Sequence, residues 1–174
     1  CLYIAQPFYA GETLEHRLTH PPKIGLKEGV GVAVKLAKAL GSLHRAGVIH
    51  RDVKPENIIL TGDGGFKLVD LGVSRIPTLA PDPVFVTGPP RYKAPEQFEG
   101  RPGDERSDIF AMGVTLYRMF TGAYPFGEIE TGQTPVFSRP APLLEKRPDL
   151  PAWLDSVILQ ALAPDPTYSD AFNL

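Results

Sequence analysis

Near its middle the chain reads as a tight β-hairpin. The apolar run at 58–60 leads into Thr-Gly-Asp-Gly-Gly at 61–65, and a second strand-like run follows at 66–69. Asp and Gly are the residues that short hairpin turns favour. Polar segments stand before and after this pair of runs, at 50–57 and 70–72. We therefore predict short strands that bracket two polar loops.

Apolar residues at helical spacing account for most of the predicted core. This spacing predicts helices over 27–43, 107–120 and 152–162, and Gly47 ends the first of them. A short helix is expected to open at Thr13. Together with the hairpin, these helices predict an α+β fold that is mainly helical.

The remaining segments lack a clear period. A short apolar run at 2–5 is expected to be a strand. Proline and glycine are frequent in 73–103, which predicts a long loop of the kind that usually carries function, and 121–150 is expected to be mostly loop.

Composition limits the compartment and the class of partner. The 174 residues suit one domain, and a net charge of -2 gives no basic footprint for nucleic acid. No apolar run is long enough for a membrane segment. The lone cysteine, Cys1, predicts no disulfide and favours a cytoplasmic location. A lipoprotein that begins at this cysteine is the alternative, but the strand expected at 2–5 leaves it no linker.

The two polar loops carry the chemistry. Asp52, Lys54 and Asn57 lie in the first loop, and Asp70 begins the second. Phosphoryl transfer needs such a set, because the protein must align a hydroxyl, neutralise charge on the transferred group and hold metal ions. These residue types therefore favour a phosphotransferase.

Three motifs in order resemble the eukaryotic-like, or Hanks-type, protein serine/threonine kinases. The segment His-Arg-Asp-Val-Lys-Pro-Glu-Asn at 50–57 is similar to their catalytic loop, Asp-Leu-Gly at 70–72 to their metal-binding tripeptide, and Ala-Pro-Glu at 94–96 to the end of their activation segment. The resemblance covers essentially the whole chain. It implies the large, C-terminal lobe of a kinase, acting on a protein substrate with ATP and Mg²⁺.

The resemblance also implies residue roles. Asp52 is expected to accept the proton of the substrate hydroxyl, and Lys54 to steady the transferred phosphoryl group. Asn57 and Asp70 are the expected magnesium ligands, and Asp70 also bridges the metal to the phosphates. The position of Lys54 is typical of serine/threonine rather than tyrosine kinases.

Two neighbours of the catalytic aspartate have different expected roles. His50 is expected to pack beneath the loop rather than to react. Arg51 is similar to the arginine through which many kinases sense a phosphate on the activation segment. The hydroxyls available there are Ser74, Thr78 and Thr87, although each of them also suits an ordinary loop.

By the same resemblance, residues 1–12 form the inter-lobe hinge and 13–174 the large lobe. Gln6 is the expected gatekeeper. The Pro7 carbonyl and the Tyr9 N–H are expected to bond the adenine, because proline lacks only the donor. The glycine-rich loop and paired lysine that cover ATP are not in this sequence, so we expect a small lobe in a longer chain and weak nucleotide binding by these residues alone.

Asp108 and the segments around it extend the resemblance. Asp108 is expected to tie back to the catalytic-loop backbone, although an aspartate near a helix start is more often only a cap. The segments 113–122, 124–130, 137–140 and 147–155 resemble bacterial kinases fused to a type 2C protein phosphatase. The last resemblance implies a phosphatase upstream and a membrane anchor downstream in the natural protein.

Two departures from the pattern favour a second interpretation. Pro89 stands where the family usually has a threonine whose hydroxyl bonds near the catalytic aspartate. No arginine follows Asp165-Pro166 to pair with Glu96, so we expect Arg101 or Arg106 to substitute or the carboxylate to be solvated. A pseudokinase or interaction module, or a truncated product without a role of its own, is therefore the alternative to an enzyme. Apart from these alternatives, apolar surface that a small lobe would cover, around Leu2, Ile4 and Leu71, is expected to be exposed.

Overall fold

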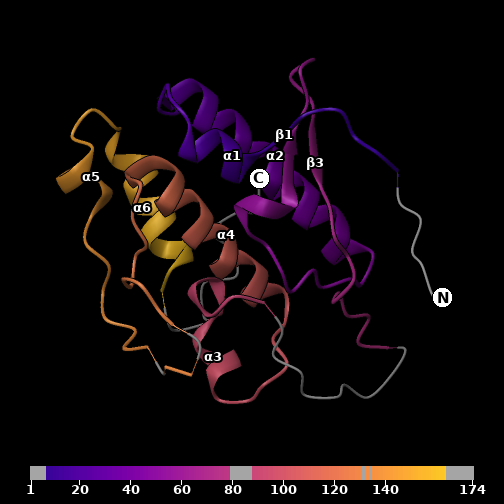
Figure 1. The fold of residues 1–174 in the computed structure, drawn as a ribbon. Coiled ribbons are helices and arrows are strands. Elements are labelled where there is room, and N and C mark those ends of the chain that lie inside the picture. The colour runs from indigo at the N-terminus through magenta and orange to yellow at the C-terminus, as the bar shows by residue number, and fades with distance from the viewer. Residues whose placement is uncertain (1–6, 79–87, 131, 134, 164–174) are drawn as a thin grey trace.

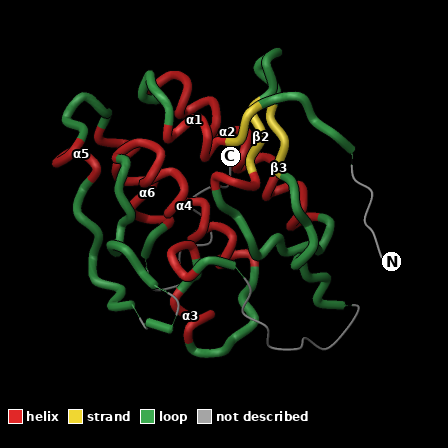
Figure 2. Tube along the Cα trace, viewed as in Figure 1, coloured by secondary structure: helices red, strands yellow, loops and turns green. Residues whose placement is uncertain are grey.

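The computed structural model describes residues 7–78, 88–130, 132–133 and 135–163. Its elements in chain order are β1 (Glu12–Thr13), α1 (Leu14–Thr19), α2 (Leu26–Arg45), η1 (Pro55–Asn57), β2 (Ile58–Leu60), β3 (Phe66–Leu68), η2 (Pro90–Tyr92), α3 (Pro95–Phe98), α4 (Glu105–Thr121), α5 (Leu143–Lys146) and α6 (Ala152–Ala161). Helices dominate, and the strands gather in one small sheet (Figure 1 and Figure 2). The mainly helical α+β arrangement predicted from the sequence is confirmed.

The predicted hairpin forms the centre of the sheet. Strands β1, β2 and β3 are antiparallel and lie in that order, with Ile58 opposite Leu68 and Leu60 opposite Phe66. Across the turn, Gly64 N–H donates to Thr61 O at 3.0 Å. The hairpin therefore places the segment before β2 beside the segment after β3.

The core is built around α4, the long helix that crosses the middle of the molecule in Figure 1. It packs against α2 on one side and α6 on the other, and most of its side chains are buried. Gly113 permits the close approach to α6, because a Cβ there would lie 3.0 Å from the Cβ of Ala161. A side chain at this position would push the two helices apart.

Caps set the starts of two helices. Thr13 Oγ1 accepts from His16 N–H at 3.1 Å, so α1 begins where the sequence predicts. Helix α4 begins before the predicted 107, because Asp104 and Ser107 form a reciprocal capping box: Asp104 N–H donates to Ser107 Oγ at 3.1 Å. Asp108 is therefore not the cap but lies inside the first turn.

The structure differs from the prediction mainly in short elements. The segments expected to be loops contain η2, α3 and α5, each of three or four residues. Such elements are too short for apolar periodicity to reveal, and a proline at N1 or at the N-cap starts each of them. The strand expected at 2–5 lies outside the described residues. In the described part of the chain, no helix is long and apolar enough to cross a membrane.

Candidate active site

The hairpin brings the two polar loops together. Val69 N–H donates to Asn57 O at 2.9 Å, which joins the end of the first loop to the residue before Asp70. Ile49 and Arg75 exchange two backbone hydrogen bonds of 2.8 Å at the outer ends of the loops. Residues that are far apart in the sequence thus line one short stretch of surface.

Within the first loop, one carboxylate oxygen gathers a cation and an amide. Lys54 Nζ lies 2.6 Å from Asp52 Oδ2, and Asn57 Nδ2 donates to the same oxygen at 2.8 Å. Asn57 Nδ2 also bonds Asp52 O at 2.8 Å. This places Lys54 on the same side as Asp52, as expected. The amide orientation also leaves Asn57 Oδ1 as an acceptor that faces away from the aspartate.

Gly88 packs against the Asp52 carboxylate. A Cβ at this position would lie 2.8 Å from Asp52 Oδ1, and the backbone has φ +88°, a conformation that favours glycine. The sequence analysis did not single out Gly88. Its signal is a glycine directly before the two prolines at 89 and 90, a pattern typical of a tight backbone approach.

We predict that Gly88→Ala lowers turnover more than it lowers substrate binding. The methyl group must displace the Asp52 carboxylate, and a misplacement of about 1 Å can cost roughly 10²-fold in rate. Initial rates of the phosphate transfer that the sequence predicts, measured with the full-length protein over a range of protein substrate, would separate kcat from KM. Gly62→Ala, where a Cβ meets nothing within 4 Å, is the matched control. Equal kcat for the two variants would show that the Gly88 contact has no role in turnover.

A buried carboxylate on α4 holds the backbone of the catalytic loop. Asp108 is 1% exposed, and its two oxygens accept from His50 N–H and Arg51 N–H, each at 2.8 Å. The expected tether is therefore confirmed. Arg51 takes up a left-handed backbone, φ 69°, which is uncommon for a side-chain-bearing residue. The tether supports this strained turn.

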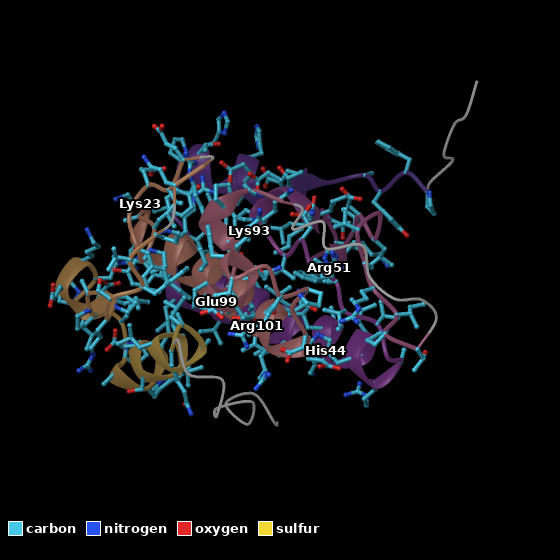
Figure 3. All side chains as sticks on the ribbon, turned by 90° about the horizontal axis from the view of Figure 1, so that it is seen from below. Lys23, His44, Arg51, Lys93, Glu99 and Arg101 are labelled. Carbon is cyan, nitrogen blue, oxygen red and sulfur yellow. The ribbon has the colours of Figure 1, made fainter. Side chains whose placement is uncertain are left out.

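A third group on the same carboxylate was not predicted. His44 Nε2, at the end of α2, lies 2.8 Å from Asp108 Oδ2. In Figure 3 the labelled His44 and Arg51 lie toward the same side of the molecule, away from Lys23. The pair joins α2 to α4 beneath the loop. No pattern in the sequence indicated a contact between residues 64 positions apart.

His50 packs beneath the loop, as predicted, and is fully buried. Asp52 N–H donates to His50 Nδ1 at 3.3 Å, so the ring proton sits on Nε2 and donates to Val69 O at 3.2 Å. The ring thus links both loops in its neutral form. Burial lowers the pKa of His50, and the negative charge of Asp108 offsets this only in part.

We predict that the stability of the fold declines as the pH falls below about 6.5. The unfolded chain takes up a proton at His50 near pH 6.5, whereas the lowered pKa delays protonation of the native state. The His50 contribution to the free energy of unfolding is therefore complete above about pH 6.5. It is lost as the pH falls from about 6.5 toward the native pKa of His50, by at most about 1.4 kcal/mol per pH unit for one proton. Urea unfolding at a series of pH values would measure this. His50→Asn, which keeps an acceptor for Asp52 N–H, should flatten the slope, and an unchanged slope would contradict the prediction.

Residues 7–9 of the predicted hinge lie against the second polar loop. Pro7, Tyr9 and Asp70 line one cavity of about 420 Å³, together with Ile59, Leu68 and neighbouring residues. Lys67 Nζ lies 5.4 Å from the centre of the Tyr9 ring. Leu71 is half exposed, as expected, whereas Leu2, Ile4 and the predicted gatekeeper Gln6 lie outside the described residues.

Asn57 and Asp70 offer oxygen atoms for a hard cation. The hydrogen bond from Val69 N–H to Asn57 O holds the backbone next to Asp70 against Asn57. Asp70 itself has a left-handed backbone with φ 66°. Among the described residues, no cluster of three or more His, Cys, Asp or Glu side chains could hold a metal. One amide and one carboxylate instead suit Mg²⁺, which binds through few protein ligands and completes its shell with water and phosphate oxygens.

Glu96 has a partner that the sequence did not predict. Ser107 Oγ donates to Glu96 Oε1 at 2.5 Å, and the glutamate is only half-buried. Of the two expected arginines, Arg101 forms an ion pair with Glu99, and Arg106 forms one with Asp104. Because Glu96 is only partly buried and accepts from the Ser107 hydroxyl, its carboxylate does not depend on an arginine alone. The 165–166 segment lies outside the described residues.

An ion pair that the sequence did not reveal supports the loop around Pro89. Arg118 on α4 donates to Tyr92 Oη at 2.9 Å and to Glu15 Oε1 on α1 at 2.7 Å. Its guanidinium also lies 5.0 Å from the centre of the Tyr124 ring. This cluster fastens η2 to two helices, which holds the adjoining Gly88 against Asp52.

The expected regulatory hydroxyls are only partly placed. Ser74 Oγ donates to His50 O at 3.3 Å, and Thr78 is exposed at the surface. Thr87 lies outside the described residues. The structure therefore gives Ser74 a bond within the catalytic loop and leaves Thr78 accessible.

Comparison with known proteins finds one family. The model of the protein kinase domain matches residues 1–165. The chain is 33% identical to "Probable serine/threonine-protein kinase CPE1738" of Clostridium perfringens, over 94% of this chain and 25% of that protein. It is 35% identical to serine/threonine-protein kinase pkn3 of Myxococcus xanthus, over 95% of this chain and 33% of that protein. With PknB of Mycobacterium tuberculosis the identity is 34%, over 94% and 27%.

The chain thus spans about a quarter to a third of the length of the curated relatives it matches. These relatives are bacterial and are named as serine/threonine kinases. The match extends from the hinge-like segment through both polar loops to the end of α6. The chain belongs to the protein kinase domain family, within which its relatives are bacterial serine/threonine kinases.

Proposed function

We propose that this chain is the large lobe of a serine/threonine kinase, with its hinge at 1–12, and that the full-length protein transfers the γ-phosphate of ATP to a hydroxyl of a protein substrate. One observation carries the proposal: Asp52 Oδ2 holds both Lys54 Nζ and Asn57 Nδ2. A base, a cation and a metal-ligand amide oxygen thus stand within one hydrogen-bonded unit. Phosphoryl transfer needs these groups together.

Each residue has one task in the proposed reaction. Asp52 accepts the proton of the attacking serine or threonine hydroxyl. Lys54, fixed 2.6 Å from Asp52, places positive charge where the phosphoryl group passes. Asn57 Oδ1 and the Asp70 carboxylate hold Mg²⁺, which neutralises phosphate charge when bound. Arg51, at the strained turn before Asp52, is proposed to bind a phosphate on Ser74, Thr78 or Thr87.

The adenine is proposed to lie in the cavity between the hinge and β3. Pro7 O and Tyr9 N–H offer an acceptor and a donor, and Ile59 supplies an apolar floor. Gln6, the proposed gatekeeper, lies outside the described residues. The glycine-rich loop and the lysine that cover the phosphates are proposed to come from another segment of the same protein. The three- to fourfold greater length of the relatives supports this.

Two finer proposals concern the setting of the domain. The resemblance of 113–122 and 147–155 to phosphatase-fused kinases supports a type 2C phosphatase domain in the natural protein. The single cysteine supports a cytoplasmic location for the kinase domain. Sequencing the gene in frame on both sides of these codons would test the fusion, and reading frames without a phosphatase would contradict it.

The test of the main proposal is a transfer assay on the full-length protein. Radiolabelled ATP, Mg²⁺ and a generic protein substrate would be supplied, and the labelled residues identified after acid hydrolysis. Label on serine or threonine would support the proposal. Label on tyrosine alone would contradict the substrate class, and no label above background would contradict the activity.

A pseudokinase or interaction module is the alternative function, and Pro89 is the observation that favours it. Proline has no hydroxyl to bond near Asp52, although here its carbonyl accepts from Tyr92 N–H at 3.2 Å. Thermal melting with and without Mg²⁺ and ATP discriminates the two. A ligand that binds only the folded protein must raise its melting temperature. A shift without phosphate transfer would favour a nucleotide-binding pseudokinase, and no shift a plain interaction module.

A further inference from the structure

A second hollow lies apart from the candidate active site. It has a volume of about 1020 Å³ and lies between the start of α2, the β2–β3 turn and the segment before β1. Its lining shares no residue with the cavity that holds Asp70 and Tyr9. We call it the α2 groove; Leu26, Val32 and Leu60 give its floor an apolar character.

The wall formed by α2 has an ordered pattern. Lys27, Gly31 and Lys35 all line the groove and follow one another at intervals of four along the helix. Residues four apart lie on one helix face, so the two lysines stand about 12 Å apart with the glycine between them. A Cβ built on Gly31 meets nothing within 4 Å. The wall therefore presents the ammonium groups of Lys27 and Lys35, with open space over Gly31 between them.

The two lysines carry charge that no acid in the described residues neutralises. Neither has an ion pair there, and Lys35 Nζ donates only to a backbone carbonyl, Gly64 O, at 2.5 Å. Of the acids in the lining, Glu28 pairs with Arg17 at 2.9 Å, and Glu12 hydrogen-bonds His16 at 2.8 Å. The α2 wall of the groove therefore presents positive charge on either side of an apolar gap.

We propose that the α2 groove binds an extended acidic peptide segment of a partner protein, with the pattern acid, any residue, apolar, any residue, acid. In an extended chain, side chains two apart share a face, so the acids and the apolar residue all point one way. The acids are then about 13 Å apart, which matches the spacing of the lysines. The apolar side chain enters the gap over Gly31. This docking site is separate from the phosphoryl-transfer site.

The test uses the 174-residue chain and labelled peptides. Peptides with the core Glu-Ser-Leu-Ser-Glu, in which the leucine is varied over Ile, Val, Met, Phe and Trp, would be compared by fluorescence anisotropy with peptides that carry lysine in place of both glutamates. We expect the best acidic peptide to bind at least about tenfold more tightly than its lysine counterpart. Equal binding of the two sets, or no binding by any peptide, would overturn the proposal.

Variants locate the binding. Gly31→Trp fills the gap, and Gly41→Trp places the same side chain on the same helix outside the groove. Lys27→Glu with Lys35→Glu reverses the charge, and Lys38→Glu is its control on an exposed site outside the groove. We expect the groove variants to weaken binding at least about tenfold and the controls to leave it unchanged.

Both lysines are exposed, so the charge variants keep the test decisive if Gly31→Trp fails to fold. Two outcomes would contradict the assignment even if peptides bind. Peptide binding that survives charge reversal would place the site elsewhere. A chain that sediments as a dimer, and becomes monomeric in the charge-reversed variant, would show that a second copy occupies the groove in place of the acidic peptide.

Discussion

Asp52→Asn is expected to reduce phosphate transfer by the full-length protein by about 10²- to 10⁴-fold, the usual contribution of a general base. Asparagine keeps the volume of the side chain and an acceptor for Asn57 Nδ2, which lies 2.8 Å from Asp52 Oδ2. It cannot take the substrate proton, and it removes the negative partner of Lys54. The loss therefore concerns chemistry and not the fold.

The measurement is the initial rate at saturating ATP, Mg²⁺ and protein substrate, alongside nucleotide affinity measured by melting temperature. Nucleotide affinity should stay within a few-fold of the wild type, because Asp52 does not line the cavity proposed for the adenine. Asp149→Asn is the matched control, since Asp149 is exposed, pairs with its neighbour Arg147 and lies far from Asp52 in the sequence. An Asp52→Asn variant that retains the wild-type rate would refute the assignment of the base.

Asp108→Ala is expected to lower the free energy of unfolding by about 3–5 kcal/mol, the range for breaking a buried charged network. The side chain is 1% exposed and accepts from His50 N–H and Arg51 N–H. Alanine would leave the buried His50 N–H and the part-buried Arg51 N–H without an acceptor, and a buried polar group without its partner incurs the full desolvation penalty. His44 would also lose the carboxylate 2.8 Å away.

Urea unfolding of the 174-residue chain would measure this effect. Asp104→Ala, which removes the half-buried cap of the same helix, should cost only about 1 kcal/mol. Asp108→Asn should fall between the two, because its one oxygen can still accept one backbone N–H. If Asp108→Ala were no more destabilising than Asp104→Ala, the tether would contribute nothing beyond a cap.

The sequence was most informative where periodicity and turn chemistry agree. Helix α2 and the β2–β3 hairpin were predicted closely, because each has a strong apolar period or an unambiguous turn. The polar loops were recognised from the residue types that phosphoryl transfer needs. That Lys54 reaches Asp52 follows from their spacing of two, and the structure confirms it.

What the sequence concealed depends on contacts between distant segments. The pairing of His44 with Asp108 and of Arg118 with Glu15 joins residues 64 and 103 positions apart, and neither has a local signature. Glu96 likewise found a hydroxyl at Ser107 that only the packing of α3 against α4 could supply. The start of α4 was misplaced because its capping box spans Asp104 to Ser107, ahead of the first apolar residue of the period.

The attachment of the catalytic loop to α4 has a consequence for its motion. The loop has little regular secondary structure, and such segments usually open locally at small free-energy cost. Here two successive backbone amides, of His50 and Arg51, end on a carboxylate in the most buried helix of the fold. Local opening of the loop must therefore break charged hydrogen bonds inside the core. Asp52 is therefore held in position before any substrate arrives. The buried helix α4, rather than the loop itself, makes this position rigid.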